Sequence, residues 1–153
     1  MSGDAHLAPA LLEAIYRHAA AGYPEEVCGL VFGPRGAAPD EVVPCENQQN
    51  LLHARDPARY PRTAATAYAL GVEDIARLDG SLAGARPCRV IYHSHVDVGA
   101  YFSDEDKRMA APPGWGPLYP DVDYLVVDVR GGRALGARQF RYADGDFVAV
   151  AEY

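Results

Sequence analysis

Two hydrophobic periodicities alternate along this chain and limit the folds that it can adopt. Apolar residues recur at helical spacing over residues 9–20 and 71–83, which predicts two amphipathic helices. Short, partly β-branched apolar runs, typical of strands, occupy residues 27–32, 41–43, 89–92, 123–129 and 134–142. The pair Gly131-Gly132 separates the last two runs and predicts a hairpin turn. Because helices and hairpins occur together, the sequence predicts an α+β or mixed-sheet α/β fold, a mixed, largely antiparallel β-sheet flanked by helices.

Two further segments are predicted to form an irregular connection and a short helix. Residues 47–66 are polar, contain Pro57 and Pro61 and follow neither period, so we predict an irregular connection there. Ser103 opens the stretch SDEDKRMA, which predicts a short helix that Ser103 caps and that ends at Ala111 or Pro112. With 153 residues, 49% of them hydrophobic, and no repeat or linker, the chain is predicted to form one domain over residues 1–153.

Charge and composition exclude several classes of partner. The formal net charge is −7 and no Lys/Arg cluster stands out, which argues against binding to nucleic acid. Residues 1–6 lack the basic start and apolar stretch of a secretory signal, and no apolar run approaches the length of a membrane span. We therefore predict a cytoplasmic protein with no membrane partner. Cys28, Cys45 and Cys88 are an odd number and far apart, which indicates buried reduced thiols.

The stretch HSHVDVGAYFSDED, residues 93–106, contains two histidines, two serines and several carboxylates that could form a metal site. Residues two apart on a strand point to the same face, so His93 and His95 can present imidazole nitrogens to one ion, while Ser94 faces away. Seven residues then lead to Ser103 and to Asp106 in the first turn of the next helix. Asp106 can close back on the histidines as a third ligand and leave the fourth position to water, which is the arrangement of a catalytic zinc.

Hydrolysis at such a centre also needs a base that takes a proton from water and passes it to the leaving group. Glu25 and Glu26 are the upstream candidates. Glu26 opens the run that contains Gly29, where the missing side chain allows another element to pack closely. Ser103 remains free to donate a hydrogen bond to the oxyanion of a tetrahedral intermediate.

These residues together resemble the signature of the JAMM, or MPN-plus, zinc metalloproteases. That signature is a glutamate, then HxH, seven residues, a serine, two residues and an aspartate, and it stands here as Glu26, His93, His95, Ser103 and Asp106 without a departure in spacing. The stretch PEEVCGLVFG is similar to the PxExCGxxxG stretch of compact bacterial members and assigns the family's glutamate to Glu26 rather than Glu25.

The resemblance implies an MPN/JAB1 fold, cytidine-deaminase-like in architecture, in which His93, His95 and Asp106 bind Zn²⁺. Glu26 is then the general acid/base, and Ser103 stabilises the oxyanion. It further implies a metallopeptidase that cuts the amide or isopeptide bond after the C-terminal Gly-Gly of ubiquitin or a ubiquitin-like protein. Two substrates stay open: lysine conjugates of such modifiers, and short C-terminal extensions of a sulfur-carrier protein. The loop over residues 112–120 corresponds to a substrate-contacting insertion of larger relatives.

Other classes compete for the same residues. Asp97 extends the motif to the HxHxD of metallo-β-lactamases, but Val98 stands where that motif needs histidine. The (β/α)₈ amidohydrolases need about 250 residues, and deaminases need HxE followed by PCxxC, neither of which this chain supplies. A catalytically silent MPN-type scaffold that mediates assembly remains the alternative function, and Asp97 remains an alternative third ligand.

Overall fold

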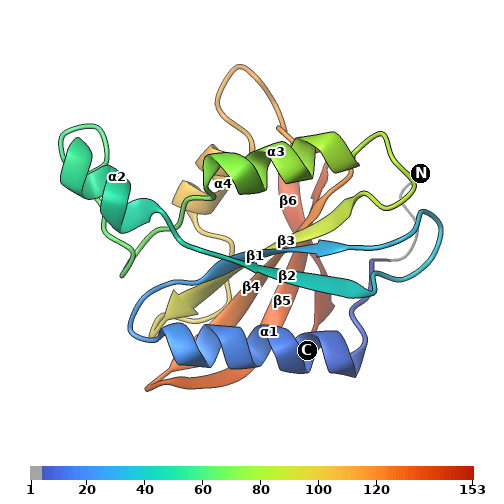
Figure 1. Ribbon diagram of the computed structural model, residues 1–153, viewed down its shortest axis with the longest axis horizontal. Coiled ribbons are helices and arrows are strands. Elements are labelled where there is room, and N and C mark those ends of the chain that lie inside the picture. Colours follow the sequence, from blue (N-terminus) through green and yellow to red (C-terminus); the bar gives the residue numbers. More distant parts are fainter. Residues whose placement is uncertain (1–4) are drawn as a thin grey trace.

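Within residues 5–153, the range that this computed structural model describes, six strands form one sheet in the order β2-β1-β3-β4-β5-β6 (Figure 1). The strands are β1 (Cys28–Phe32), β2 (Glu41–Cys45), β3 (Cys88–Val96), β4 (Asp123–Arg130), β5 (Arg133–Ala143) and β6 (Asp146–Glu152). Neighbouring strands are antiparallel except β3 and β4, which are parallel. The predicted mixed, largely antiparallel sheet is confirmed. Residues 1–4, part of the segment on which the prediction of no secretory signal rests, lie outside the described range.

Helices cover both faces of this sheet (Figure 1). The helix α1 (Pro9–Gly22) lies on one face, α3 (Val72–Ser81) and α4 (Asp104–Ala110) lie on the other, and α2 (Gln49–Arg55) stands at one end. Side chains alternate along the strands, so Val31 and Tyr92 pack in the core under α1. Leu30 and Ile91 belong to the core under α3 and α4. The helices predicted over residues 9–20 and 71–83 are confirmed, each with an end shifted by two residues.

The side chain of Tyr92 in β3 packs directly over Gly29 in the neighbouring strand β1. A Cβ at this position would lie 2.2 Å from atoms of the Tyr92 ring, and Tyr92 is its partner in the strand register. The close packing predicted for Gly29 is therefore confirmed. The same register places Cys28 opposite His93, so the residues just before β1 lie beside the middle of β3.

The structure corrects the prediction for residues 47–66. This segment contains α2, a helix of seven residues that is too short to show a helical period. Asn47 Oδ1 accepts hydrogen bonds from the backbone N–H of Gln49, in the first turn of α2, and from that of Ala69, both at 3.0 Å. The helix is thus fixed by a bond to a distant residue, which local periodicity does not report.

Two differences concern the strands. The strand predicted to end at Tyr92 continues as β3 to Val96, because the backbone N–H of Ser94 donates to Val27 O and the pairing with β4 extends to Val129. His93 and His95 therefore lie within a paired strand rather than beyond its end. The edge strand β6 had no counterpart among the predicted strands.

Between residues 5 and 153, no helix is both long and apolar enough to cross a membrane. The three cysteines are buried and free, as predicted. Burial raises the pKa of each thiol, which keeps the sulfurs protonated and chemically inert. The three side chains pack in the hydrophobic core under α3 and α4.

Candidate metal centre

Three buried side chains bring one ligand atom each to a common point. His93 Nε2 lies 3.3 Å from His95 Nε2 and 3.2 Å from Asp106 Oδ1, and His95 Nε2 lies 3.1 Å from Asp106 Oδ2. An ion with tetrahedral bonds of about 2.0–2.1 Å to nitrogen and oxygen separates its ligand atoms by about 3.3 Å. Within residues 5–153, no fourth His, Cys, Asp or Glu joins this cluster. The donors therefore suit a zinc ion with one position left for water or substrate.

The pleat of β3 places both histidines on the sheet face that carries α4. Ile91, two residues before His93, belongs to the core under that face. Ser94 points the other way, and its Oγ accepts a hydrogen bond of 2.8 Å from the backbone N–H of Val27. Ser94 therefore faces away from the histidines, as predicted, and its hydroxyl ties β3 to the residue before β1.

Asp106 lies in the first turn of α4, which positions its side chain. Ser103 is the N-cap, and its Oγ accepts a hydrogen bond from the Asp106 N–H at 3.0 Å. In return, the Ser103 N–H donates to Asp106 Oδ2, also at 3.0 Å. This reciprocal capping box orients the carboxylate toward the histidines, and it confirms the predicted cap at Ser103 and the helix end at Ala111.

The charges and tautomers of this cluster suit metal binding. Burial lowers the pKa of His93, which favours the neutral imidazole that a metal requires. Burial acts to raise the pKa of Asp106, but His93 and His95 outweigh it and hold that pKa well below its usual range. His95 Nδ1 lies 2.9 Å from Gly99 O, a carbonyl that accepts a hydrogen bond from Nδ1–H and so leaves the Nε2 lone pair for an ion. His93 is instead held by stacking on Tyr68, with ring centroids 4.4 Å apart.

Glu26 lies at the edge of this cluster, two residues before β1. Its side chain is only 7% exposed. Burial, and then the charge of Asp106, raise the pKa of Glu26 to about 9, while Arg62 acts in the opposite direction. A buried carboxyl close to a cluster that suits a cation has the properties of a proton carrier, because a bound cation lowers that pKa toward neutrality.

The alternatives to Glu26 and Asp106 lie elsewhere. Asp97 Oδ2 accepts a hydrogen bond of 2.8 Å from the Tyr23 hydroxyl, and Asp97 Oδ1 accepts one of 2.9 Å from the Gly131 N–H. Asp97 is not part of the His-His-Asp cluster. The exposed Glu25 binds the side chain of Asn50 through Oε2 at 2.6 Å. Of the two neighbouring glutamates, Glu26 is therefore the one buried beside the cluster.

The structure adds a group of residues that the motif did not indicate. Asn47 Nδ2 donates to Glu26 O at 2.8 Å and to Ala67 O at 3.1 Å. The Glu26 N–H donates to Ala64 O at 2.7 Å. Asn50 Oδ1 accepts from the Ala64 N–H at 2.8 Å. These bonds fasten residues 62–69 against Glu26, and only the unusual number of amides in the stretch ENQQN hints at them in the sequence.

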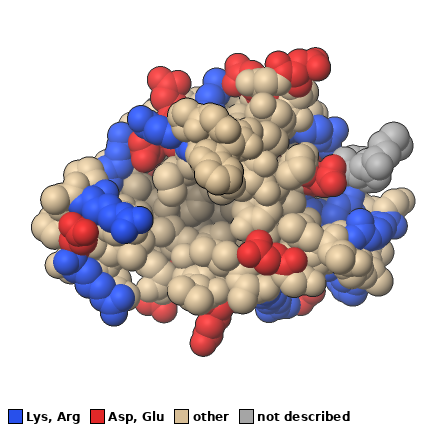
Figure 2. All heavy atoms as spheres, turned by 90° about the horizontal axis from the view of Figure 1, so that it is seen from above, with Lys and Arg blue, Asp and Glu red and all other residues tan. Residues whose placement is uncertain are grey.

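Beside the cluster lies a cavity of about 630 Å³. Asp106 and Tyr68 both line it, and α4 and residues 59–70 supply much of its wall. Figure 2 looks onto this face of the molecule, which is hollowed between its centre and the end that carries α2. A substrate in this cavity would therefore contact the predicted ligand Asp106 directly.

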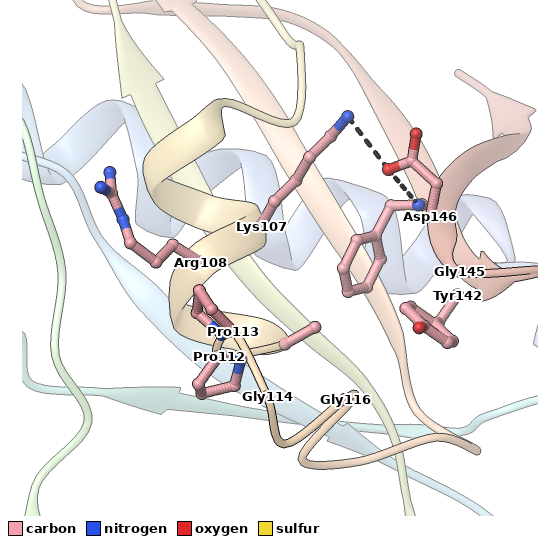
Figure 3. Close-up of a pocket in the computed structure, with 11 residues that line it drawn as sticks. Lys107, Arg108, Pro112, Pro113, Gly114, Gly116, Tyr142, Gly145 and Asp146 are labelled. Atoms are coloured by element: carbon pink, nitrogen blue, oxygen red, sulfur yellow. Dashed lines mark hydrogen bonds and ion pairs between the residues drawn. The ribbon is translucent and has the colours of Figure 1, made fainter.

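A second cavity, of about 470 Å³, lies between α4, the loop that follows it and the turn from β5 to β6 (Figure 3). Lys107 spans it and pairs with Asp146 at 3.1 Å. None of the five predicted site residues lines this cavity. Trp115, in the same loop, is 84% exposed. The role of the loop over residues 112–120 in substrate contact stays a prediction.

The fold and the cluster define a protein of the JAB class, and comparison with known proteins agrees. Residues 8–141 match the model of the prokaryotic homologs of the JAB domain, so the chain belongs to this family. The predicted resemblance to compact bacterial MPN proteins is confirmed.

The chain also resembles curated proteins and solved structures. The chain is 29% identical over 137 residues to the CysO-cysteine peptidase of Mycobacterium tuberculosis, a match that covers 88% of this chain and 80% of that protein. Among solved structures, it is similar to a protein of Desulfitobacterium hafniense, with a TM-score of 0.63 and 18% identity over 93% of this chain and 86% of the other. It is also similar to a protein of Salinibacter ruber, with a TM-score of 0.61 and 21% identity over 99% of this chain and 89% of the other. At such identities, the two structures support the fold alone.

Proposed function

We propose that this protein is a zinc-dependent peptidase that hydrolyses the amide bond after the C-terminal Gly-Gly of a ubiquitin-like sulfur-carrier protein. The observation that carries the proposal is the convergence of His93, His95 and Asp106 on one point, with the buried carboxyl Glu26 close by. The sulfur carrier is favoured over lysine conjugates of ubiquitin-like modifiers because a relative at 29% identity is a CysO-cysteine peptidase.

His93, His95 and Asp106 are the residues that would hold the ion. Two neutral imidazoles and a carboxylate are the donors of many catalytic zinc sites. When bound, the zinc supplies a Lewis acid that lowers the pKa of water and polarises the carbonyl of the bond to be cut. The remaining chemistry belongs to the side chains around it.

Glu26 moves the proton. Its carboxylate accepts a proton from the attacking water and delivers it to the nitrogen of the leaving amino group. The position of Glu26 is fixed by backbone bonds to Asn47 and Ala64, so the carboxyl has little freedom to drift from the reacting atoms. Its burial excludes bulk water, which strengthens its interaction with charges that develop during the reaction.

Ser103 stabilises the oxyanion. Its Oγ accepts the N–H of Asp106, so the hydroxyl proton is not used in the cap and is free to point at the substrate. A hydroxyl placed next to a metal ligand is well positioned to donate to a carbonyl oxygen as that oxygen becomes negative. Capping and catalysis are therefore compatible roles for one side chain.

The test is an assay with a defined substrate. A recombinant ubiquitin-fold sulfur carrier that ends in Gly-Gly plus one cysteine is incubated with zinc-loaded protein, and the product is weighed by mass spectrometry. We expect loss of the cysteine alone, and inhibition by a chelator. Glu26→Gln should retain zinc but reduce kcat by about 10²–10⁴-fold, because only proton transfer is removed.

The alternative, a catalytically silent scaffold, predicts different results. A scaffold would bind no zinc and would not cleave the carrier. Neither a chelator nor Glu26→Gln would then alter the assay. The complete set of ligands favours the enzyme, since a silent module has no need to retain them. Near-normal turnover in Glu26→Gln would refute the assignment of the base.

A further inference from the structure

The cavity of about 630 Å³ beside Asp106 contains two arginines, Arg59 and Arg62, from the loop that follows α2. Both are exposed. The chain as a whole carries a net charge of −7, so a pair of arginines beside the active site is a local exception to its acidic character. In Figure 2, Lys and Arg side chains lie at both ends of the molecule, one of which carries α2.

Neither guanidinium has an ion-pair partner within residues 5–153. Arg62 Nη1 donates one hydrogen bond, of 3.3 Å, to Thr66 O, which leaves most of its five donors available. The acidic residues of the cavity are already engaged. Asp106 contacts the two histidines, and Glu105 pairs with Arg108 at 2.6 Å.

Arg62 is also held close to the reacting atoms. Gln49, a buried amide of α2, donates to Arg62 O at 3.0 Å and fixes the backbone there. Two residues later, Ala64 O accepts the N–H of Glu26 at 2.7 Å. Arg62 is close enough to Glu26 for its charge to affect that carboxyl's pKa. A group bound by Arg62 would therefore lie near the bond that Glu26 helps to break.

We propose that this cavity receives the amino acid that leaves, and that Arg62, which lines the cavity together with Arg59, binds the free α-carboxylate of that amino acid. This inference rests on the proposed function and sharpens its substrate class. In the reaction, the bond between the glycine carbonyl and the amide nitrogen breaks, the hydroxyl of water joins the carbonyl carbon, and a proton joins the nitrogen. The products are the carrier carboxylate and one free amino acid.

The position of a carboxylate distinguishes the possible substrates. In a carrier extended by a single residue, the carboxyl carbon is two bonds from the nitrogen that leaves. A lysine conjugate has a side-chain methylene there, and a longer extension has another amide. The planar fork of an arginine matches a carboxylate through two parallel hydrogen bonds. The enzyme is thereby an exopeptidase, selective for one terminal residue.

The test compares two carriers that end in Gly-Gly-Cys, one with a free carboxylate and one with a C-terminal amide. We expect wild-type protein to cleave the acid with a kcat/KM about 10- to 100-fold higher than the amide, as for loss of a charge-assisted hydrogen bond. In Arg62→Gln this ratio should fall to near one. Arg17→Gln is the matched control, because Arg17 lies on α1, across the sheet, and pairs with Glu13; it should keep the wild-type ratio.

Binding gives a second readout that does not depend on turnover. In the Glu26→Gln variant, calorimetry should show that the carrier with a free C-terminal carboxylate binds more tightly than the carrier with a C-terminal amide. Adding Arg62→Gln should make the two affinities equal. Equal cleavage of acid and amide by the wild type overturns the inference and leaves the proposed function standing. An Arg62→Gln variant that slows both substrates equally, with a shifted pH profile, would show that Arg62 acts on Glu26 instead. Failure to cleave either carrier overturns the proposed function itself.

Discussion

The two sides of the candidate site are built in different ways. On the metal side, regular structure places each group: the pleat of β3 aligns His93 with His95, and the capping box of α4 orients Asp106. On the substrate side, residues 47–70 contain one short helix and are held by amide side chains that bind distant backbone groups. Local regularity specifies the metal side, whereas contacts between residues far apart specify the substrate side.

The largest expected effect comes from breaking the metal side. Asp106→Ala removes a proposed ligand and half of the capping box, so zinc binding should be lost and the proposed peptidase activity should fall to background. Zinc per chain after dialysis, measured by elemental analysis, checks this. Asp97→Asn is the control and should keep its zinc, because Asp97 binds Tyr23 and Gly131 instead. Full zinc occupancy in Asp106→Ala would contradict the assigned ligand.

Ser103 belongs to the metal side in structure but is proposed to act on the substrate, and two variants separate these roles. Ser103→Gly and Ser103→Ala both lose the hydroxyl and should lower kcat by about 10²–10³-fold. Glycine is a tolerable N-cap, so Ser103→Gly should lose only a few tenths of a kcal/mol, against about 1 kcal/mol for Ser103→Ala. Kinetics and thermal unfolding measure the two effects. An unchanged kcat in Ser103→Gly would leave Ser103 as a cap only.

Asn47 tests the substrate side alone. Its side chain makes four hydrogen bonds to backbone groups, so Asn47→Ala should cost about 1–3 kcal/mol of unfolding free energy. It should also raise KM, since residues 62–69 lose their attachment, while zinc content stays normal. Asn47→Asp keeps the acceptor for Gln49 and Ala69 but turns an oxygen toward the carbonyls of Glu26 and Ala67, so it should not restore the lost stability. If zinc is lost in parallel, the two sides are not independent.

The smallest effect is a pH dependence of stability in the zinc-free protein. Burial and the charge of Asp106 raise the pKa of Glu26 to about 9, above its value in the unfolded chain. The folded state therefore holds more protons between the two pKa values, and stability falls as pH rises. From pH 7 to 9, the melting temperature should therefore decline. Glu26→Gln should flatten this decline; an equal slope in both proteins would mean that another group causes it.

The same contrast explains how much the sequence could predict. His93 with His95, and Ser103 with Asp106, are separated by two and three residues, so strand and helix geometry alone bring them together. Asn47 and Gln49 act on residues more than ten positions away, and no local pattern reports such bonds. The edge strand β6 escaped prediction because Phe147 is its only buried residue, so its sequence lacks a clear alternation.

The bonds that hold residues 62–69 in place end on main-chain atoms: the carbonyls of Arg62, Ala64 and Ala67, and the amides of Ala64 and Ala69. Main-chain atoms persist when a side chain is exchanged. The exposed side chains of this segment can therefore be diversified, by evolution or in a library, without loosening the frame around Glu26, whereas Tyr68, which stacks on His93, has to stay. Selectivity for a new leaving group could be acquired here while the hydrolytic machinery is inherited intact.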